Sequence, residues 1–320
     1  MSQRRARPVG DHVRCEKCGQ TNPAEAQYCG ACGSELPGLR PVRLRRKSAL
    51  IAAAGALFVL LLIAGIRIGL EVKTRADDAA FRQARRADTL QAYVDYTKKF
   101  PRGLHFREAV DLALHCAART GDCVAAQALI AKGANVNARG KDGVPPLRLA
   151  AAYSKNMTEL LIAKGADVNA ADNRGLTPLH AAAATGQVDC AQILIDNGAD
   201  VNVRDSRSAC TTPLHLAVSA EGDTAKILAR TFVAKILIDH GADVNAKDTK
   251  QGWTPLHDAV AFGNKAAVKL LISSRANTGA ADVKGITPGV LAFAGGDPDM
   301  MDLLGMHDSA ALYRSGLVRR

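Results

Sequence analysis

A short phrase that recurs along the second half of the chain constrains its fold more than any other feature. The phrase Gly-Ala-Asn/Asp-Val-Asn starts at Gly133, Gly165, Gly198 and Gly241. A Pro-Leu phrase, followed by histidine in three copies, recurs at Pro146, Pro178, Pro213 and Pro255, with a partial copy at Pro288. Successive prolines are 32, 35, 42 and 33 residues apart. A period near 33 residues predicts a repeat solenoid, in which each unit buries its apolar face against its neighbours.

The residues of each unit predict two short helices joined by turns. Proline suits the first helical turn, where its missing N–H is not needed, and the preceding threonine caps that helix. Glycine after the second helix, as at Gly133, allows the left-handed conformation that ends it. The apolar stripe between neighbouring units comprises Leu129-Ile130, Leu161-Ile162, Leu194-Ile195, Leu237-Ile238 and Leu271-Ile272. No unit has a core of its own, so we expect stability to be shared between neighbours.

Three copies of Thr-Pro-Leu-His carry a resemblance to a known family. They stand at Thr177–His180, Thr212–His215 and Thr254–His257. Both the phrase and the period are similar to the ankyrin repeat, and residues 112–320 hold about six such units, the last a degenerate cap. The resemblance implies a mainly α fold, an ankyrin-repeat solenoid, that binds proteins through its finger tips and the concave face of its inner helices. The strict position of the histidines predicts structural hydrogen bonds between repeats rather than catalysis or metal binding.

Variable positions of the inner helices and fingers are the candidates for contact with a protein partner. These candidates are Arg119, Tyr153, Arg207, Trp253, Asp258 and Phe262. Aromatic and arginine side chains are the usual interface anchors, but packing of Tyr153 and Phe262 between repeats is the alternative.

Two repeats depart from the common pattern. The second reads Val144-Pro145-Pro146-Leu147-Arg148 and lacks both threonine and histidine, so we expect the weakest contacts between repeats there. The fourth carries about eight extra residues near 219–231, which predict a longer helix or a protruding loop.

Ahead of the repeats lies an uninterrupted apolar run, Ala49 to Ile66, without a charged or strongly polar residue. As a helix it would be about 27 Å long, close to the hydrocarbon thickness of a bilayer. We therefore predict one transmembrane helix over residues 48–70, in contact with the lipid bilayer. A buried helix of a soluble domain is less favoured because the run is long and apolar. A cleaved signal peptide is less favoured because no small-x-small cleavage site follows.

The head of the chain, residues 1–36, has half of the eight cysteines. Cys15, Cys18, Cys29 and Cys32 form a C-x2-C-x10-C-x2-C pattern with a glycine after each pair. Four thiolates complete a tetrahedral zinc shell, and so short a segment needs metal binding to fold. Iron suits four sulfurs as well, and disulfide bonds or redox-active thiols would also account for the two cysteine pairs.

With Asn22-Pro23, Tyr28 and Gly33–Leu36, this cysteine pattern resembles the short zinc-ribbon domain at the N-termini of many bacterial membrane proteins. The resemblance implies a pair of zinc knuckles on short hairpins, with zinc as a structural cofactor. Its members bind proteins or nucleic acid, so the resemblance does not choose between them. Four cysteine ligands leave no open position for a catalytic water.

Basic residues concentrate ahead of the repeats. Residues 1–75 hold 13 Lys and Arg against 5 Asp and Glu, a net charge of +8. Subtraction from the totals of 42 and 31 leaves 29 against 26, only +3, for residues 76–320. The linker 37–47 ends in a basic cluster that abuts the apolar run, which favours a cytoplasmic N-terminus over contact with nucleic acid. We therefore expect a single-pass protein of the bacterial inner (cytoplasmic) membrane with a periplasmic ankyrin tail.

Cysteines in the tail bear on this topology. They are Cys116, Cys123, Cys190 and Cys210. Four thiols that stay unpaired would favour a reducing compartment, against the periplasmic assignment.

Residues 71–111 join the apolar run to the repeats and have helical periodicity. Asp88 suits a helix N-cap, and Phe100-Pro101-Arg102-Gly103 is a clear break. The segment looks like a tetratricopeptide-type helix pair, and we expect this neck to cap the repeats.

The sequence contains no nucleophile–base–orienter set and no phosphate-cradling glycine loop, so we do not expect an enzyme. We expect a membrane-anchored scaffold or adaptor that binds a protein through its ankyrin repeats, with a structural zinc ribbon on the opposite membrane face. The alternative is a membrane-tethered nucleic-acid-binding protein that uses the zinc ribbon and the basic linker.

Overall fold

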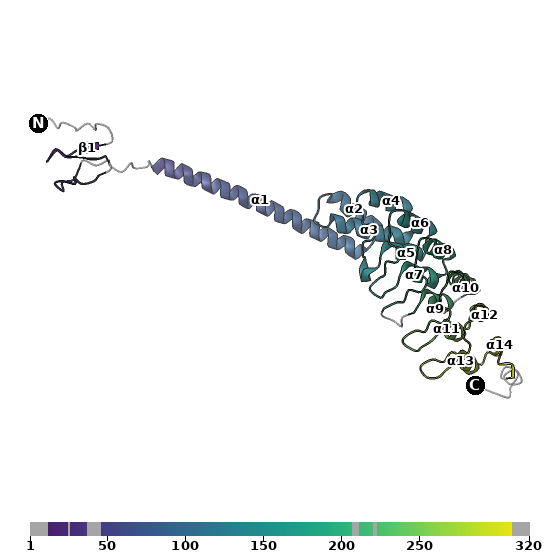
Figure 1. Ribbon diagram of the computed structural model, residues 1–320. Coiled ribbons are helices and arrows are strands. Elements are labelled where there is room, and N and C mark those ends of the chain that lie inside the picture. Colours follow the sequence, from purple (N-terminus) through teal and green to yellow (C-terminus); the bar gives the residue numbers. More distant parts are fainter. Residues whose placement is uncertain (1–11, 25, 37–45, 207–210, 220–222, 309–320) are drawn as a thin grey trace. The chain divides into compact units, whose positions relative to one another are not determined.

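The computed structural model describes residues 12–24, 26–36, 46–206, 211–219 and 223–308, without the side chains of residues 46–57. Two compact units divide the chain, residues 1–72 and residues 73–320. Figure 1 shows a small strand-containing head in the first unit and a stack of helix pairs in the second.

The described head, residues 12–36, is built from two small hairpins. Strands β1 (His12–Arg14) and β2 (Thr21–Pro23) pair antiparallel. A single bridge between Tyr28 and Glu35 closes the second hairpin. The buried apolar side chains of the head are Cys15, Cys29 and Leu36, with Ala26 packed against them. This small number of apolar side chains does not stabilise a fold by itself. The head therefore needs a further source of folding free energy.

Helix α1 (Arg46–Ala87) is 42 residues long and contains the predicted span, residues 48–70. Its side chains from Phe58 to Leu70 are exposed, whereas the side chains of residues 48–57 lie outside the described part. Within the described residues, no helix is both long enough and apolar enough to cross a membrane. The helix continues without a break into residues 71–87, which the sequence assigns to the neck. Residue 70 is therefore not a boundary between secondary-structure elements.

The neck turns at the end of α1, before α2 (Leu90–Lys99). Asp88 has a left-handed backbone with a φ of 45°. The N-cap of α2 is Thr89, whose side chain accepts a hydrogen bond from the N–H of Ala92. The predicted cap is therefore one residue off, because Asp88 forms the turn and Thr89 caps α2. The predicted break at Phe100–Gly103 is present, since α2 ends at Lys99.

Asp77, buried near the end of α1, ties this helix to the turn that follows α2. Its carboxylate accepts hydrogen bonds from the Tyr96 hydroxyl and, at 2.6 Å, from the N–H of Leu104. Gly103 is needed in that turn because a Cβ there would lie 2.8 Å from oxygens of Asp77 and Tyr96. Helix α3 (Phe106–Thr120) follows and also belongs to the first repeat, so residue 111 falls inside a helix.

Six helix pairs form the array in the described part of the second unit. The inner helices are α3, α5 (Pro146–Ala151), α7 (Pro178–Thr185), α9 (Pro213–Val218), α11 (Pro255–Ala261) and α13 (Pro288–Gly295). The outer helices are α4 (Cys123–Ala131), α6 (Lys155–Ala163), α8 (Val188–Asp196), α10 (Thr224–Asp239), α12 (Lys265–Ser273) and α14 (Pro298–Leu303). Figure 1 shows an inner and an outer row, with the long loops, or fingers, beside the inner row. The 3-10 helix η1 (Lys141–Gly143) lies in the first finger.

The recurring phrase sets the start of the inner helices. In α7, Thr177 and His180 form a reciprocal capping box, and Pro178 occupies the first turn. Gly186 ends this helix in the left-handed conformation with a φ of 75°. The leucines that close the space between pairs are almost fully buried: Leu147, Leu161, Leu179, Leu194, Leu214, Leu237, Leu256 and Leu271. These positions confirm the predicted solenoid, in which the core runs continuously from pair to pair.

The second repeat replaces the lost histidine by an ion pair. Arg148 Nη2 lies 3.4 Å from Asp172 Oδ2 in the next finger, and the Asp172 side chain is 3% exposed. A charged contact thus stands where the other repeats have a neutral hydrogen bond, and the weakest contacts at this repeat stay a prediction.

The fourth repeat uses its extra residues as a longer helix, one of the two predicted alternatives. Helix α10 has 16 residues, whereas α8 has nine. The added turns contact the end of α7, where a Cβ on Gly186 would lie 3.1 Å from Ala229 and from Arg230. Arg230 also donates hydrogen bonds to the carbonyls of Leu216 and Ser219 at the end of α9. The described part of the insert is thus anchored on two inner helices.

Candidate functional site

The two cysteine pairs of the head lie in turns with the same hydrogen bonds. In the first turn, the N–H of Gly19 donates to the carbonyl of Cys15 at 2.9 Å. In the second turn, the N–H of Gly33 donates to the carbonyl of Cys29, also at 2.9 Å. Both glycines have positive φ values, 75° and 68°, which a glycine adopts without strain. The sequence therefore builds one knuckle twice.

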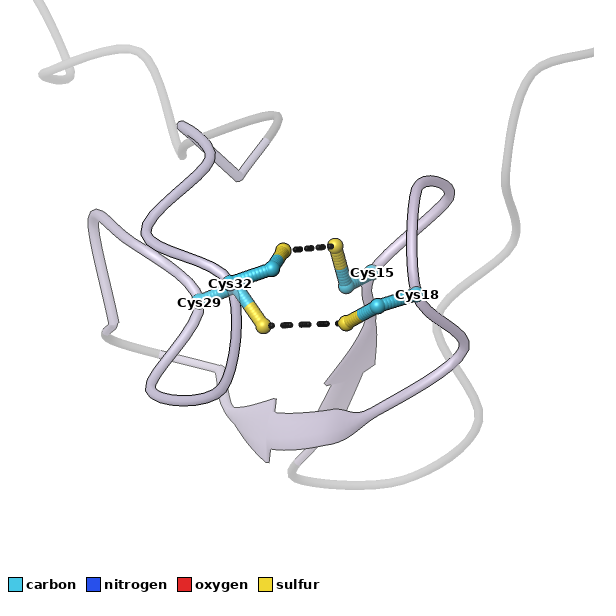
Figure 2. A group of neighbouring side chains, drawn as sticks. All are labelled: Cys15, Cys18, Cys29 and Cys32. Atoms are coloured by element: carbon cyan, nitrogen blue, oxygen red, sulfur yellow. Dashed lines mark hydrogen bonds between the residues drawn. The ribbon is translucent and has the colours of Figure 1, made fainter.

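The four cysteine sulfurs come together between the knuckles. All four lie within 4.8 Å of one another. Figure 2 shows each sulfur of one knuckle facing a sulfur of the other, with Cys15–Cys32 at 3.6 Å and Cys18–Cys29 at 3.5 Å. A disulfide would need about 2.05 Å. Zinc–sulfur bonds of about 2.3 Å in a tetrahedron place sulfurs about 3.8 Å apart, so the donor set fits a tetrahedral metal.

Two polar side chains, Ser34 and Asn22, contact the cysteine sulfurs. The Ser34 hydroxyl lies 2.8 Å from Cys32 Sγ and 3.3 Å from Cys15 Sγ. Asn22, almost fully buried, donates from Nδ2 to Cys29 Sγ at 3.5 Å. Such contacts orient metal-binding thiolates and spread their negative charge.

The cysteine pKa values reflect both these donors and the crowding of the thiols. Hydrogen bonds from the Ser34 hydroxyl and then from backbone N–H groups lower the pKa of Cys15 to about 6. The N–H groups of Ala31 and Cys32 lower the pKa of Cys29. For Cys18 the N–H of Gln20 acts in the lowering direction, but the neighbouring thiols raise its pKa to about 12. A divalent metal bound between them would offset the negative charge of four thiolates at this spacing.

The histidines of the array bridge neighbouring repeats. His180 Nδ1 accepts a hydrogen bond from the N–H of Thr177, and its Nε2 donates to the carbonyl of Thr211 at 3.2 Å. His215 and His257 make the same contacts one and two repeats further on. Burial lowers the pKa of each of these three histidines, so the neutral ring is favoured. The predicted structural role is confirmed.

Three of the partner-binding candidates lie in the inner helices or in the turns that directly follow them. Tyr153 is 66% exposed at the end of α5, and Phe262 is 38% exposed at the equivalent end of α11. Asp258, one turn earlier in α11, is partly buried. Burial and then the charge of Asp248 raise the pKa of Asp258 to about 7. We name the uncovered side of α5, α7, α9, α11 and α13 the inner face.

The remaining candidates are engaged within the chain or lie outside the described residues. Arg119 donates to the backbone carbonyl of Asp88 at 3.1 Å and holds the neck against the first repeat. Trp253 is partly buried and donates from Nε1 to Asp282 Oδ2 at 3.3 Å, which links two fingers. Arg207 falls in residues 207–210, outside the described part. Two of the six candidates thus have structural contacts that their sequence positions do not indicate.

Leu228 and Phe232 are exposed apolar residues that are not among the sequence-predicted candidates. They stand four residues apart on α10 and are 46% and 60% exposed. A helical spacing of apolar residues inside the insert is the signal that points to them, since residues four apart share one helix face.

A cleft of about 640 Å³ lies between the neck and the first finger. Several polar groups on its wall contact one another: Tyr93 donates to Asp88 at 3.3 Å, and Asp111 accepts from the N–H of Asn135 at 2.7 Å. Arg85 lies 3.6 Å from Glu108. These contacts hold the neck to the array and leave no activated nucleophile among the described lining residues.

Comparison with known proteins gives two family matches. Residues 114–205, 169–248 and 206–282 match the family model described as ankyrin repeats, in three copies. Together these matches span residues 114–282, more than half of the chain, and the chain belongs to the ankyrin-repeat family. Residues 11–37 match a domain of unknown function, DUF7577. No protein with a curated description matches the chain.

Proposed function

We propose that this protein is a membrane-anchored scaffold or adaptor that binds a protein partner through its ankyrin repeats, without enzymatic activity. The observation that carries the proposal is the inner face, where Tyr153 and Phe262 are exposed in equivalent positions of a rigid repeat array. Large aromatic side chains on a preformed surface are frequent anchors of protein interfaces.

Membrane anchoring rests on the apolar residues of α1. Ala49 to Ile66 contains no charge, and the side chains from Phe58 to Leu70 are exposed. A contiguous exposed apolar surface of this kind needs lipid or another protein to cover it. The basic cluster of the linker supports a cytoplasmic head and a periplasmic array in a bacterial inner membrane.

Two of the tail cysteines, Cys116 and Cys190, do not weigh against that topology, whereas Cys123 is free and only partly buried. Cys116 and Cys190 are buried, and burial raises the pKa of each thiol. A buried neutral thiol reacts slowly with oxidants and persists unpaired in an oxidising compartment. Cys210 lies outside the described residues.

The head is proposed as a structural zinc ribbon on the opposite membrane face. Cys15, Cys18, Cys29 and Cys32 would hold the ion, and their four thiolates would fill its coordination shell. The metal would supply folding free energy to a segment with a very small core.

Capture of a partner from a membrane extract by the full-length chain tests the scaffold function. Tyr153→Ala and Phe262→Ala should each weaken a saturable complex about tenfold or more, as expected for buried interface anchors. Val124→Ala, on the outer helix α4 and 80% exposed, is the control and should leave binding unchanged. A complex that is indifferent to both inner-face variants would contradict the proposal.

Protease treatment tests the anchoring and its direction. In spheroplasts of the native cells, an external protease should digest the array and spare the head. Release of the chain by alkaline carbonate, or protection of the array in sealed spheroplasts, would overturn this part of the proposal.

The alternative, a nucleic-acid-binding protein, rests on the net charge of +8 in residues 1–75. It predicts that the zinc-loaded chain binds DNA or RNA with an affinity that falls steeply as salt is raised. Salt-independent binding, or none, would remove this alternative.

A further inference from the structure

One position of the fifth repeat breaks a pattern that its neighbours keep. Asp258 stands three residues after Pro255, the first residue of α11. The equivalent residues of repeats two, four and six are leucines, Leu149, Leu216 and Leu291. All three leucines are partly buried. A carboxylate therefore occupies a position on the inner face that is otherwise apolar in the adjoining repeats.

Asp258 also differs from the finger aspartates in its lack of partners. Asp172, Asp205, Asp248 and Asp282 each accept hydrogen bonds from backbone N–H groups of their own finger. Among the described residues, Asp258 has no hydrogen-bond or ion-pair partner for its carboxylate, and its charged form is disfavoured by burial and by Asp248. A partly buried carboxylate without a partner in the protein costs folding free energy, which its place in the first turn of α11 offsets only in part.

Among the described residues, no positive charge acts on Asp258. Helix α11 packs against α9 and α13 in the inner row and against α12 in the outer row. On α9 and α13, the residues in register with Asp258 are Leu216 and Leu291, which are neutral. Phe262, one helical turn further along α11, adds an exposed aromatic ring. The site thus combines one hydrogen-bond acceptor, the Asp258 carboxylate, with apolar side chains around it.

We propose that Asp258 anchors an arginine or lysine side chain of the protein partner bound at the inner face. This inference rests on the proposed protein-binding function and specifies the chemistry that the partner presents. An ionised carboxylate only accepts hydrogen bonds, so its partner must supply N–H or O–H donors. Arginine and lysine carry N–H donors at the end of an aliphatic stem, and this stem packs on leucine. A single carboxylate offers too few oxygens for a metal ion, which argues for a cationic side chain.

Selection from a random-peptide phage library on the immobilised full-length chain tests the proposal. The selected peptides should share an arginine or lysine at one position. Their affinity should fall about tenfold or more for Asp258→Leu, because a charge-assisted hydrogen bond is lost. Leucine occupies this position in three other repeats, so the variant should fold, which circular dichroism checks. Glu159→Gln, which removes a negative charge from the exposed surface of outer helix α6, is the matched control and should bind as the wild type does.

The outcomes separate this inference from the scaffold function. Peptides without a shared basic residue, or equal binding by wild type and Asp258→Leu, would overturn the anchor. Failure to enrich any peptide would overturn it as well. The scaffold function is decided independently, by capture of a folded partner and its dependence on Tyr153 and Phe262.

Discussion

The head and the array of this protein are both built from small repeated units, but the two differ in what stabilises them. Both repeat a short unit that has no adequate core of its own. In the head, two knuckles surround four sulfurs, and among its described residues only Cys15, Cys29 and Leu36 are buried and apolar. In the array, each helix pair contributes leucines to a core that continues into the next pair. Repetition alone does not stabilise either fold: the array depends on contacts between neighbouring repeats, and we propose that the head depends on a bound metal.

Metal removal should produce the largest difference in stability between the head and the array. A strong chelator should unfold the head completely, because metal binding supplies about 10–16 kcal/mol to such sites, while the helical array stays folded. NMR spectra of the full-length chain should lose the dispersed signals of residues 12–36 and keep those of the array. A head that keeps its dispersed signals without metal would contradict this account.

A cavity inside the array should have the next largest effect. Leu194→Ala removes a fully buried side chain between neighbouring repeats and should lower the free energy of unfolding by about 2–5 kcal/mol. Because repeats share their stability, neighbouring repeats should lose protection together in hydrogen exchange. Loss confined to the third repeat alone would show that the core is not shared. Metal affinity of the head should not change.

Ser34, next to the cysteine sulfurs, tests how much a neighbouring side chain contributes to metal binding by the head. Ser34→Ala removes the hydroxyl that lies within 3.3 Å of both Cys15 and Cys32, and zinc affinity should fall about tenfold. Competition with a fluorescent chelator measures this change. Glu35→Gln, an exposed neighbour, serves as the control. Equal affinity for Ser34→Ala and wild type would remove the serine from the metal site.

The effect of replacing Asp258 on stability depends on pH. Because its folded pKa, about 7, lies above the usual 3.8, its stabilising contribution is complete below pH 4 and is lost as pH rises through 7. Asp258→Leu should therefore match the wild type near pH 4 and exceed its stability above pH 7 by on the order of 1–3 kcal/mol. Urea unfolding at both pH values measures the difference. A pH-independent difference would contradict burial as its cause.

Sequence periodicity predicts the main architecture because its signals are local. The threonine, proline and histidine of each phrase act within one helix turn and the next repeat, as His180 does with Thr177 and Thr211. The grouping of the four cysteines is equally predictable, because each pair lies in one tight turn. Both predictions needed no knowledge of distant contacts.

Other features depend on contacts between residues far apart in the chain, which a single sequence does not reveal. In the sequence, Arg148 is a departure from the repeat pattern, whereas in the structure it forms an ion pair with Asp172 in the next finger. The sequence predicts Trp253 as an interface anchor, whereas in the structure its ring N–H donates a hydrogen bond to Asp282. The unpartnered state of Asp258 likewise emerges only when α9 and α13 are placed beside it.

Photo-cross-linking in native cells tests the central claim, a protein-binding inner face, most directly. A photoreactive phenylalanine analogue is placed at position 153, at position 262, or at position 124 on the outer row. The account predicts one discrete adduct with the same protein from positions 153 and 262, and none from position 124. Adducts from position 124 alone, or no adduct from either inner-face position, would contradict it.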